Sequence, residues 1–230
     1  MSIRNNTNKN KIILLVTGEA GVGKSYISNK LEHIAKKKDI KLTNIEFDII
    51  GHEILNSLTS SYYKNIRKKL LTTFSEQILY KKEIENLFIS RKALSKIVFN
   101  DNEKLKTLNK IMRRPILKRL NEILKDKSGI ILINGALVAE FKLSYLSNNN
   151  VIIIKSSKEI QNERLKQRNL STQMIKKILL SQFNVDDKIK AINKQIEKDK
   201  CGKIIIFNNE NAKDKDICVL LNNILNIYLK

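Results

Sequence analysis

Five short runs of apolar, mostly β-branched residues are spaced along the chain, and each is continuous rather than alternating. Continuous runs of this kind are typical of parallel strands that are covered on both faces of a sheet. The runs are Lys11–Thr17, Ile40–Phe47, Gly129–Asn134, Asn150–Lys155 and Lys203–Asn208. Helical periodicity lies between them, so the sequence predicts a three-layer α/β fold with a five-stranded parallel sheet.

One connection is longer than a single crossover helix requires. About 80 residues separate the second and third runs, and a loop of that length inside a compact domain indicates inserted structure. Helical spacing recurs in this connection over Ile54–Leu58, Tyr62–Tyr80, Ile89–Val98 and Glu103–Leu124. We therefore predict one domain, 1–230, with a core at about 11–58 and 128–230 and a helical, substrate-covering insertion at about 59–127.

A second charged helical stretch spans about 156–187. It opens with Ser156-Ser157-Lys158-Glu159, in which a serine precedes a glutamate by three residues and predicts a capping box.

A hydrophobic content of 42% in 230 residues suffices for one sizeable core. No apolar run approaches the 18 or more residues that a membrane-spanning helix needs, and the first residues lack a signal-peptide pattern. Cys201 and Cys218 have no metal-ligand spacing and suggest no disulfide framework. We therefore expect a cytoplasmic protein that does not contact a membrane.

The net charge of +21 is the one property that favours nucleic acid as a partner. The charge is spread along the chain, however, without a basic arm or aromatic residues among the lysines. Heavy use of Lys, Asn and Ile is the composition expected of an AT-rich genome. We therefore attribute the charge to composition and expect no nucleic-acid partner, although such a field would also draw in a small polyanionic substrate.

Arginine is scarce in this lysine-rich chain and is therefore informative. A guanidinium offers a planar fork for bidentate phosphate contact, which lysine cannot reproduce. Six of the eight arginines are candidate phosphate ligands: Arg91, Arg113, Arg114, Arg119, Arg164 and Arg168. For Arg119 we favour an ordinary surface role.

The most specific motif follows the first predicted strand. Residues 18–25 read G-x-x-x-x-G-K-S, the pattern of a phosphate-binding loop, and a helical pattern follows. Glycines allow backbone N–H groups to approach phosphate, the lysine reaches the β and γ phosphates, and the serine hydroxyl ligates Mg²⁺. The predicted ATP-binding residues here are Gly18, Glu19, Ala20, Gly21, Val22, Gly23, Lys24, Ser25 and Tyr26, with Ser25 as the metal ligand.

Other polar residues follow the second and third strands, where ligands bind in such sheets. Asp48 could deprotonate an acceptor hydroxyl or hold Mg²⁺ through water, and the alternative is an N-cap for the next helix. Asn134 stands where many phosphate-loop enzymes place an aspartate. His52 is a surface or substrate-contact residue, and Glu140 is a helix-start carboxylate or a ligand.

Several segments, in order and spacing, resemble the dephospho-coenzyme A kinase family from about Lys11 to Asn209. After the phosphate loop these are Glu46–His52, Ser90–Phe99, Arg114-Pro115, Asn134–Glu140 and Glu163–Ser171, with Gln182 and Asn208 also at family positions. Four residues depart from the family pattern, namely Glu46, Arg114, Asn134 and Ala136.

The resemblance implies ATP-dependent phosphorylation of the ribose 3′-hydroxyl of dephospho-coenzyme A, with Mg²⁺ as cofactor, in a phosphate-loop kinase fold whose lid is the 156–187 stretch. It implies catalytic roles for Asp48, Lys24 and Arg168, and places Arg164 and Asn208 at ATP. Acceptor contacts are expected from Asp48, His52, Arg91, Arg114 and Glu140. We expect a monomer or weak homo-oligomer. The alternatives are another small-molecule or nucleotide kinase, or a nucleotide-binding regulatory NTPase.

Overall fold

The chain divides into two units, one within residues 1–46 and 127–230 and the other within residues 47–126. A computed structural model describes residues 11–83, 86–168 and 171–228. The predicted insertion, 59–127, falls almost wholly within the second unit, which starts earlier than expected because it includes the helix that follows the second strand.

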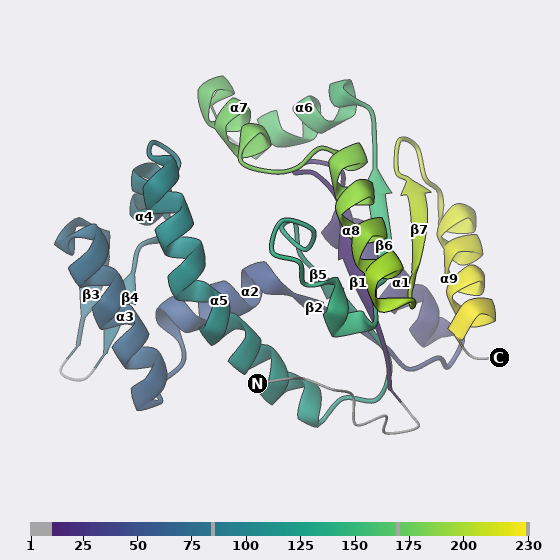
Figure 1. Ribbon diagram of the computed structural model, residues 1–230, viewed down its shortest axis with the longest axis horizontal. Coiled ribbons are helices and arrows are strands. Elements are labelled where there is room, and N and C mark those ends of the chain that lie inside the picture. The colour runs from purple at the N-terminus through teal and green to yellow at the C-terminus, as the bar shows by residue number, and fades with distance from the viewer. Residues whose placement is uncertain (1–10, 84–85, 169–170, 229–230) are drawn as a thin grey trace. The chain divides into compact units, whose positions relative to one another are not determined.

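The first unit is built on a five-stranded parallel sheet (Figure 1). Its strands are β1 (Lys11–Thr17), β2 (Leu42–Glu46), β5 (Gly129–Asn134), β6 (Asn150–Lys155) and β7 (Lys203–Asn208). The spatial order is β2-β5-β1-β6-β7, so β1 is central. The predicted sheet is confirmed, and only β2 is shorter than expected, since Phe47 already begins a helix.

Helices cover the sheet on both faces. They are α1 (Lys24–Lys37) and α9 (Asp214–Tyr228) on one face, and α8 (Val185–Asp199) with the 3₁₀ turn η2 (Ser144–Ser147) on the other. Two further helices, α6 (Lys158–Lys166) and α7 (Thr172–Leu180), pack against each other. Alternate strand residues such as Leu14 and Leu132 pack with Leu31 of α1 and Leu221 of α9 in one buried cluster. The turn η2 packs against β1 and β6, and α8 packs against β7 and η2.

The predicted 156–187 stretch forms α6, α7 and the start of α8. The N-cap of α6 is Ser157, whose Oγ accepts a hydrogen bond from the Ile160 N–H. The capping box expected from Ser156 and Glu159 is therefore wrong, because the third helical residue after this N-cap is Ile160 and not a glutamate. Asn169 and Leu170, part of the segment behind the family resemblance, lie outside the described residues.

The second unit combines helices with a small hairpin. Its elements are α2 (Phe47–Asn56), α3 (Ser61–Phe74), the 3₁₀ turn η1 (Glu76–Ile78), β3 (Leu79–Lys82), β4 (Leu87–Ile89), α4 (Arg91–Val98) and α5 (Asn102–Lys125). The predicted helix over Tyr62–Tyr80 is wrong at its C-terminal end. Ser75 takes a positive φ of 84° with an extended ψ of 158°, which ends α3, and β3 then pairs antiparallel with β4.

Arg67 of α3 holds the end of α2 within this unit. Its side chain is buried, and its guanidinium donates to the Ile54 carbonyl at 2.8 Å and to the Leu58 carbonyl at 2.9 Å. Burial lowers the pKa of Arg67 from its ordinary value. The helix end therefore depends on a buried cation that supplies donors to carbonyls the helix leaves unpaired.

We expect Arg67→Met to destabilise the protein by about 2 kcal/mol, because two carbonyls lose charge-assisted hydrogen bonds. Chemical denaturation followed by circular dichroism measures this loss. Lys68→Met, at the exposed neighbouring position, is the matched control and should leave the midpoint unchanged. Equal midpoints for the two variants would contradict a structural role for Arg67.

Candidate active site

The phosphate-loop motif forms a turn between β1 and α1. Gly23 is the N-cap of α1 in a left-handed backbone with φ of 88°. A Cβ at Gly23 would lie 2.4 Å from Asn209 Nδ2, and one at Gly18 would lie 2.2 Å from the Ile154 carbonyl oxygen. Both positions therefore require glycine, and the backbone N–H groups at the start of α1 are left able to meet an anion.

Side chains from distant parts of the chain hold the loop backbone. The Val22 carbonyl accepts hydrogen bonds from Asn209 Nδ2 at 2.8 Å and Arg164 Nη1 at 3.1 Å. Arg164 Nη2 also donates to the Asn209 carbonyl at 3.0 Å. Arg164, expected to bind ATP, is thus engaged with the loop itself, and its contact with nucleotide stays a prediction.

The structure distinguishes between two adjacent asparagines. Asn208, the residue predicted to lie near ATP, is exposed at the end of β7, whereas Asn209 is only 2% exposed and holds the loop. Sequence reasoning missed Asn209 because the choice between neighbours depends on which side of the chain each faces as it leaves the strand.

The first half of the loop is held in the same way. Lys24 Nζ donates to the Glu19 carbonyl at 2.9 Å, and the buried Glu19 carboxylate pairs with Lys158 Nζ at 2.7 Å. The Ala20 N–H donates to Gln182 Oε1 at 3.0 Å. Lys158 was missed by sequence reasoning, because one lysine among so many carries no signal.

Two oxygen-bearing side chains meet at the start of α1. Ser25 Oγ donates to Glu46 Oε2 at 2.9 Å, and Asn44 Nδ2 donates to Glu46 Oε1 at 3.3 Å. Glu46 lies at the end of β2, next to Asn134 of β5 in the sheet register. Among the described residues no group of three or more His, Cys, Asp or Glu could hold a metal ion, so any metal here requires further oxygens from phosphate and water.

The remaining predicted donor-site residues are exposed. Tyr26 lies in the first turn of α1 with 49% of its surface exposed, and Arg168 follows the C-cap of α6. Neither placement tests the predicted contact with ATP.

The predicted acceptor residues divide between the two units. Asp48 and His52 are exposed on α2, Arg91 is the first residue of α4, and Arg114 is exposed on α5. Asp48 lies inside the first helical turn because α2 begins at Phe47, so the N-cap alternative for Asp48 is wrong. Arg119 forms a partly buried ion pair with Glu53 of α2, so it has a structural contact beyond the ordinary surface role expected for it.

Glu140, also predicted to contact the acceptor, belongs to the first unit. Its Oε1 is paired with Lys188 Nζ at 2.5 Å, where the lysine side chain is fully buried and the glutamate is 11% exposed. The contact of Glu140 with the acceptor stays a prediction.

A cavity of about 510 Å³ opens beside the loop in the first unit. Glu19, Lys158 and Gln182 line it together with apolar side chains from α7 that include Ile175 and Leu179. The loop residue Glu19 and its neighbours Lys158 and Gln182 therefore face a space large enough for part of a substrate.

The fold and the intact loop together define a phosphate-loop nucleotide-binding protein of the small-molecule kinase class. A family model described as dephospho-CoA kinase matches residues 12–212, and the chain belongs to that family. The family prediction made from the motifs is therefore confirmed.

Individual relatives agree with this assignment. The dephospho-CoA kinase of Borreliella burgdorferi is 30% identical over 206 residues, covering 88% of each chain. That of Fusobacterium nucleatum is 27% identical over 205 residues, covering 88% of this chain and 92% of the relative. The crystal structure of TT1252 from Thermus thermophilus superposes with a TM-score of 0.66 at 18% identity, covering 95% of this chain and 98% of that one, which supports the fold.

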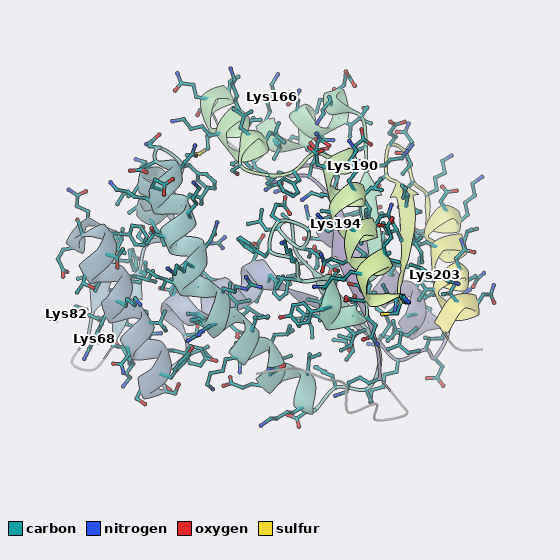
Figure 2. The ribbon with its side chains drawn as sticks, in the orientation of Figure 1. Lys68, Lys82, Lys166, Lys190, Lys194 and Lys203 are labelled. Atoms are coloured by element: carbon teal, nitrogen blue, oxygen red, sulfur yellow. The ribbon has the colours of Figure 1, made fainter. Side chains whose placement is uncertain are left out.

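Within the described parts of the chain, no helix combines the length and apolar character needed to cross a bilayer. The positive charge is carried by many elements, as the labelled lysines on α3, β3, α6, α8 and β7 illustrate (Figure 2).

We expect Asn209→Ala to weaken ATP binding about tenfold, because the loop loses a buried hydrogen bond to Val22. Asn211→Ala, at an exposed position two residues further on, is the matched control and should change the dissociation constant less than twofold. Isothermal titration calorimetry of each variant with Mg-ATP measures the difference. Equal affinities in the two variants would contradict a role for Asn209 in holding the loop.

Proposed function

We propose that this chain transfers the γ-phosphoryl group of ATP to the ribose 3′-hydroxyl of dephospho-coenzyme A, giving coenzyme A and ADP. The proposal rests on a complete phosphate loop whose backbone is hydrogen-bonded to Asn209 and Gln182, in a chain that the family model matches over residues 12–212. The enzyme is a phosphotransferase with an alcohol group as acceptor, and the reaction completes coenzyme A synthesis.

The donor half of the reaction uses residues 18–25. Phosphate oxygens are bound by the loop N–H groups at the N-terminus of α1. Lys24 exchanges its hydrogen bond with the Glu19 carbonyl for the β and γ phosphates when ATP arrives. Since the loop is already folded, little ordering remains to oppose binding.

Ser25 and Glu46 are the residues that would hold Mg²⁺. Their hydroxyl and carboxylate oxygens lie within hydrogen-bonding distance of each other, and hard oxygen ligands suit this ion, which is bound through one or two carboxylates plus phosphates and water. When bound, the ion neutralises charge on the transferred phosphoryl group. Glu46 would supply the metal-binding carboxylate at this end of the sheet, because its neighbour Asn134 has a neutral amide.

The acceptor half is assigned to Asp48, His52, Arg91 and Arg114, with Glu140 as a further expected contact. Asp48 orients the 3′-hydroxyl and accepts its proton, while the arginines bind the acceptor's own phosphates. Arg168 reaches the transferring phosphoryl group from the lid, and lid closure excludes water that would hydrolyse ATP. Phosphoryl transfer needs mainly such positioning and charge stabilisation.

We also propose that the protein is cytoplasmic, that it is a monomer or a weak homo-oligomer, and that it has no nucleic-acid partner. The rival functions are phosphorylation of another small molecule and acceptor-independent NTP hydrolysis. The net charge of +21 favours NTP hydrolysis if DNA or RNA is the activator, because a basic protein attracts nucleic acid.

An acceptor panel tests the proposal. Purified protein with Mg-ATP should release ADP rapidly with dephospho-coenzyme A and slowly with nucleosides, nucleotides, shikimate, DNA or RNA. A coupled ADP assay measures all of these under one condition. Stimulation by another acceptor, or by nucleic acid, but not by dephospho-coenzyme A would overturn the assignment.

Asp48→Asn should lower kcat with dephospho-coenzyme A by about 10²–10⁴-fold, because the acceptor hydroxyl loses its base. Its affinity for ATP, measured separately by calorimetry, should remain near that of the unchanged protein. Asp39→Asn, at an exposed turn residue, is the control and should keep full activity. Full turnover in Asp48→Asn would remove Asp48 from the mechanism.

Glu46→Gln should weaken the dependence of ATP affinity on Mg²⁺, because a neutral amide replaces the proposed metal-binding carboxylate. We expect the ratio of ATP dissociation constants without and with Mg²⁺ to fall about fivefold, while affinity without the metal changes little. Titrations in EDTA and in Mg²⁺ give this ratio without any turnover. Glu32→Gln, on α1, is the control, and an identical ratio in both variants would exclude Glu46 as a metal ligand.

A further inference from the structure

Lys188 of α8 is a buried cation that the proposed reaction does not use. Its side chain is fully buried, whereas Lys190 and Lys194 on the same helix are exposed (Figure 2). Lys188 Nζ donates to Glu140 Oε1 at 2.5 Å and to the Ala136 carbonyl at 2.7 Å. Burial lowers the pKa of Lys188, and the neighbouring Glu140 carboxylate opposes that shift.

Stability alone is a weak reason for such a pair. Removing two charges from water is costly, and replacement of a buried ion pair by apolar groups is often neutral for folding. Within the described residues, Glu140 Oε2 is also buried without a hydrogen-bond partner. The ion pair is therefore better explained by a segment that it holds in position.

The pair is connected to the phosphate loop through the segment between α7 and α8. Glu140 Oε1 accepts a second hydrogen bond, at 2.8 Å, from the Phe183 N–H. The residue before Phe183 is Gln182, whose Oε1 accepts from the Ala20 N–H of the loop at 3.0 Å. One carboxylate oxygen thus fixes the backbone that presents Gln182 to the loop.

A second connection leads from Lys188 to the same loop. The Ala136 carbonyl that binds Lys188 Nζ also accepts from Thr17 Oγ1 at 3.2 Å, and Thr17 immediately precedes Gly18. Lys188 therefore links α8, through the Ala136 carbonyl, to the residue that precedes the loop. Arg164 and Asn209 instead bind Val22, near the end of the loop.

We propose that Lys188 and Glu140 are positioning residues that hold Gln182 on the Ala20 N–H and thereby keep the phosphate loop in its nucleotide-binding conformation. Neither residue need touch ATP. The benefit is preorganisation, since a loop that is already ordered loses less conformational freedom when it binds a ligand. The inference rests on the proposed function for its nucleotide but is independent of the acceptor.

The test is a double-mutant cycle on ATP affinity, measured by calorimetry with Mg-ATP and no acceptor. Lys188→Met with Glu140→Leu removes both charges together, so no buried charge is left unpaired, and the exposed Phe183 N–H can bond to water. We expect this pair of changes, and Gln182→Leu separately, each to weaken binding about fivefold to tenfold. Lys190→Met is the matched control on α8 and should bind ATP normally.

The decisive variant combines all three changes. If the ion pair acts through Gln182, the triple variant binds ATP no more weakly than Gln182→Leu alone, because coupled residues are not additive. Losses that multiply would overturn the proposal, since a general structural effect is independent of Gln182. Normal affinity in the folded Lys188→Met, Glu140→Leu variant would overturn it as well.

A folding defect in the double variant does not remove the test. Gln182 is only half-buried, so Gln182→Leu is expected to fold, and wild-type ATP affinity in that variant overturns the proposal on its own. Because dephospho-coenzyme A is absent throughout, a failed acceptor assay and a failed positioning role give separate results.

Discussion

The Val22 carbonyl is the point on which the arrangement of the site depends. It accepts hydrogen bonds from Arg164, which follows β6 on α6, and from Asn209, which follows β7. These side chains can converge only because β6 and β7 lie in order beside β1 in the sheet. A backbone group in a glycine-rich turn is thereby held by two separate parts of the chain.

Pairing with a lysine also allows two carboxylates to be buried beside the loop. Glu19 pairs with Lys158, and Glu140 pairs with Lys188, so each carboxylate has a cation within 2.7 Å. Removing Lys188 or Glu140 alone would leave an uncompensated charge, because both side chains of that pair are buried. In the proposed reaction the phosphates of ATP meet a loop whose backbone is held by protein groups, and preorganised donors are the condition under which electrostatic stabilisation is most effective.

The residues proposed for donor and acceptor chemistry adjoin each other in sequence at one short junction. Glu46 ends the first segment of one unit, and Asp48, two residues further on, belongs to the first turn of α2 in the other. The unit of 47–126 is joined to the rest at this junction and after residue 126. The proposed metal ligand and the proposed base are therefore separated by only one residue, Phe47.

The sheet could be predicted from sequence because buried parallel strands are continuous β-branched runs, and four of the five strands have the predicted bounds. The helix predicted over 62–80 was wrong at its C-terminal end because Ser75 adopts a positive backbone φ, which its residue type does not signal. The loop motif identified its own residues, but not what holds them. Asn209, Lys158 and Lys188 depend on long-range packing, and in a lysine-rich chain the two lysines carry no local signal.

We propose that the phosphate loop serves phosphoryl transfer to one particular hydroxyl group, the ribose 3′-hydroxyl of dephospho-coenzyme A. Proton–phosphorus correlation spectroscopy of the product formed from ATP and dephospho-coenzyme A identifies the oxygen that receives the phosphoryl group. We expect a single new phosphomonoester coupled to the ribose 3′ proton, formed in equal amount with ADP. Inorganic phosphate as the main product, or a phosphomonoester at another position, would contradict it.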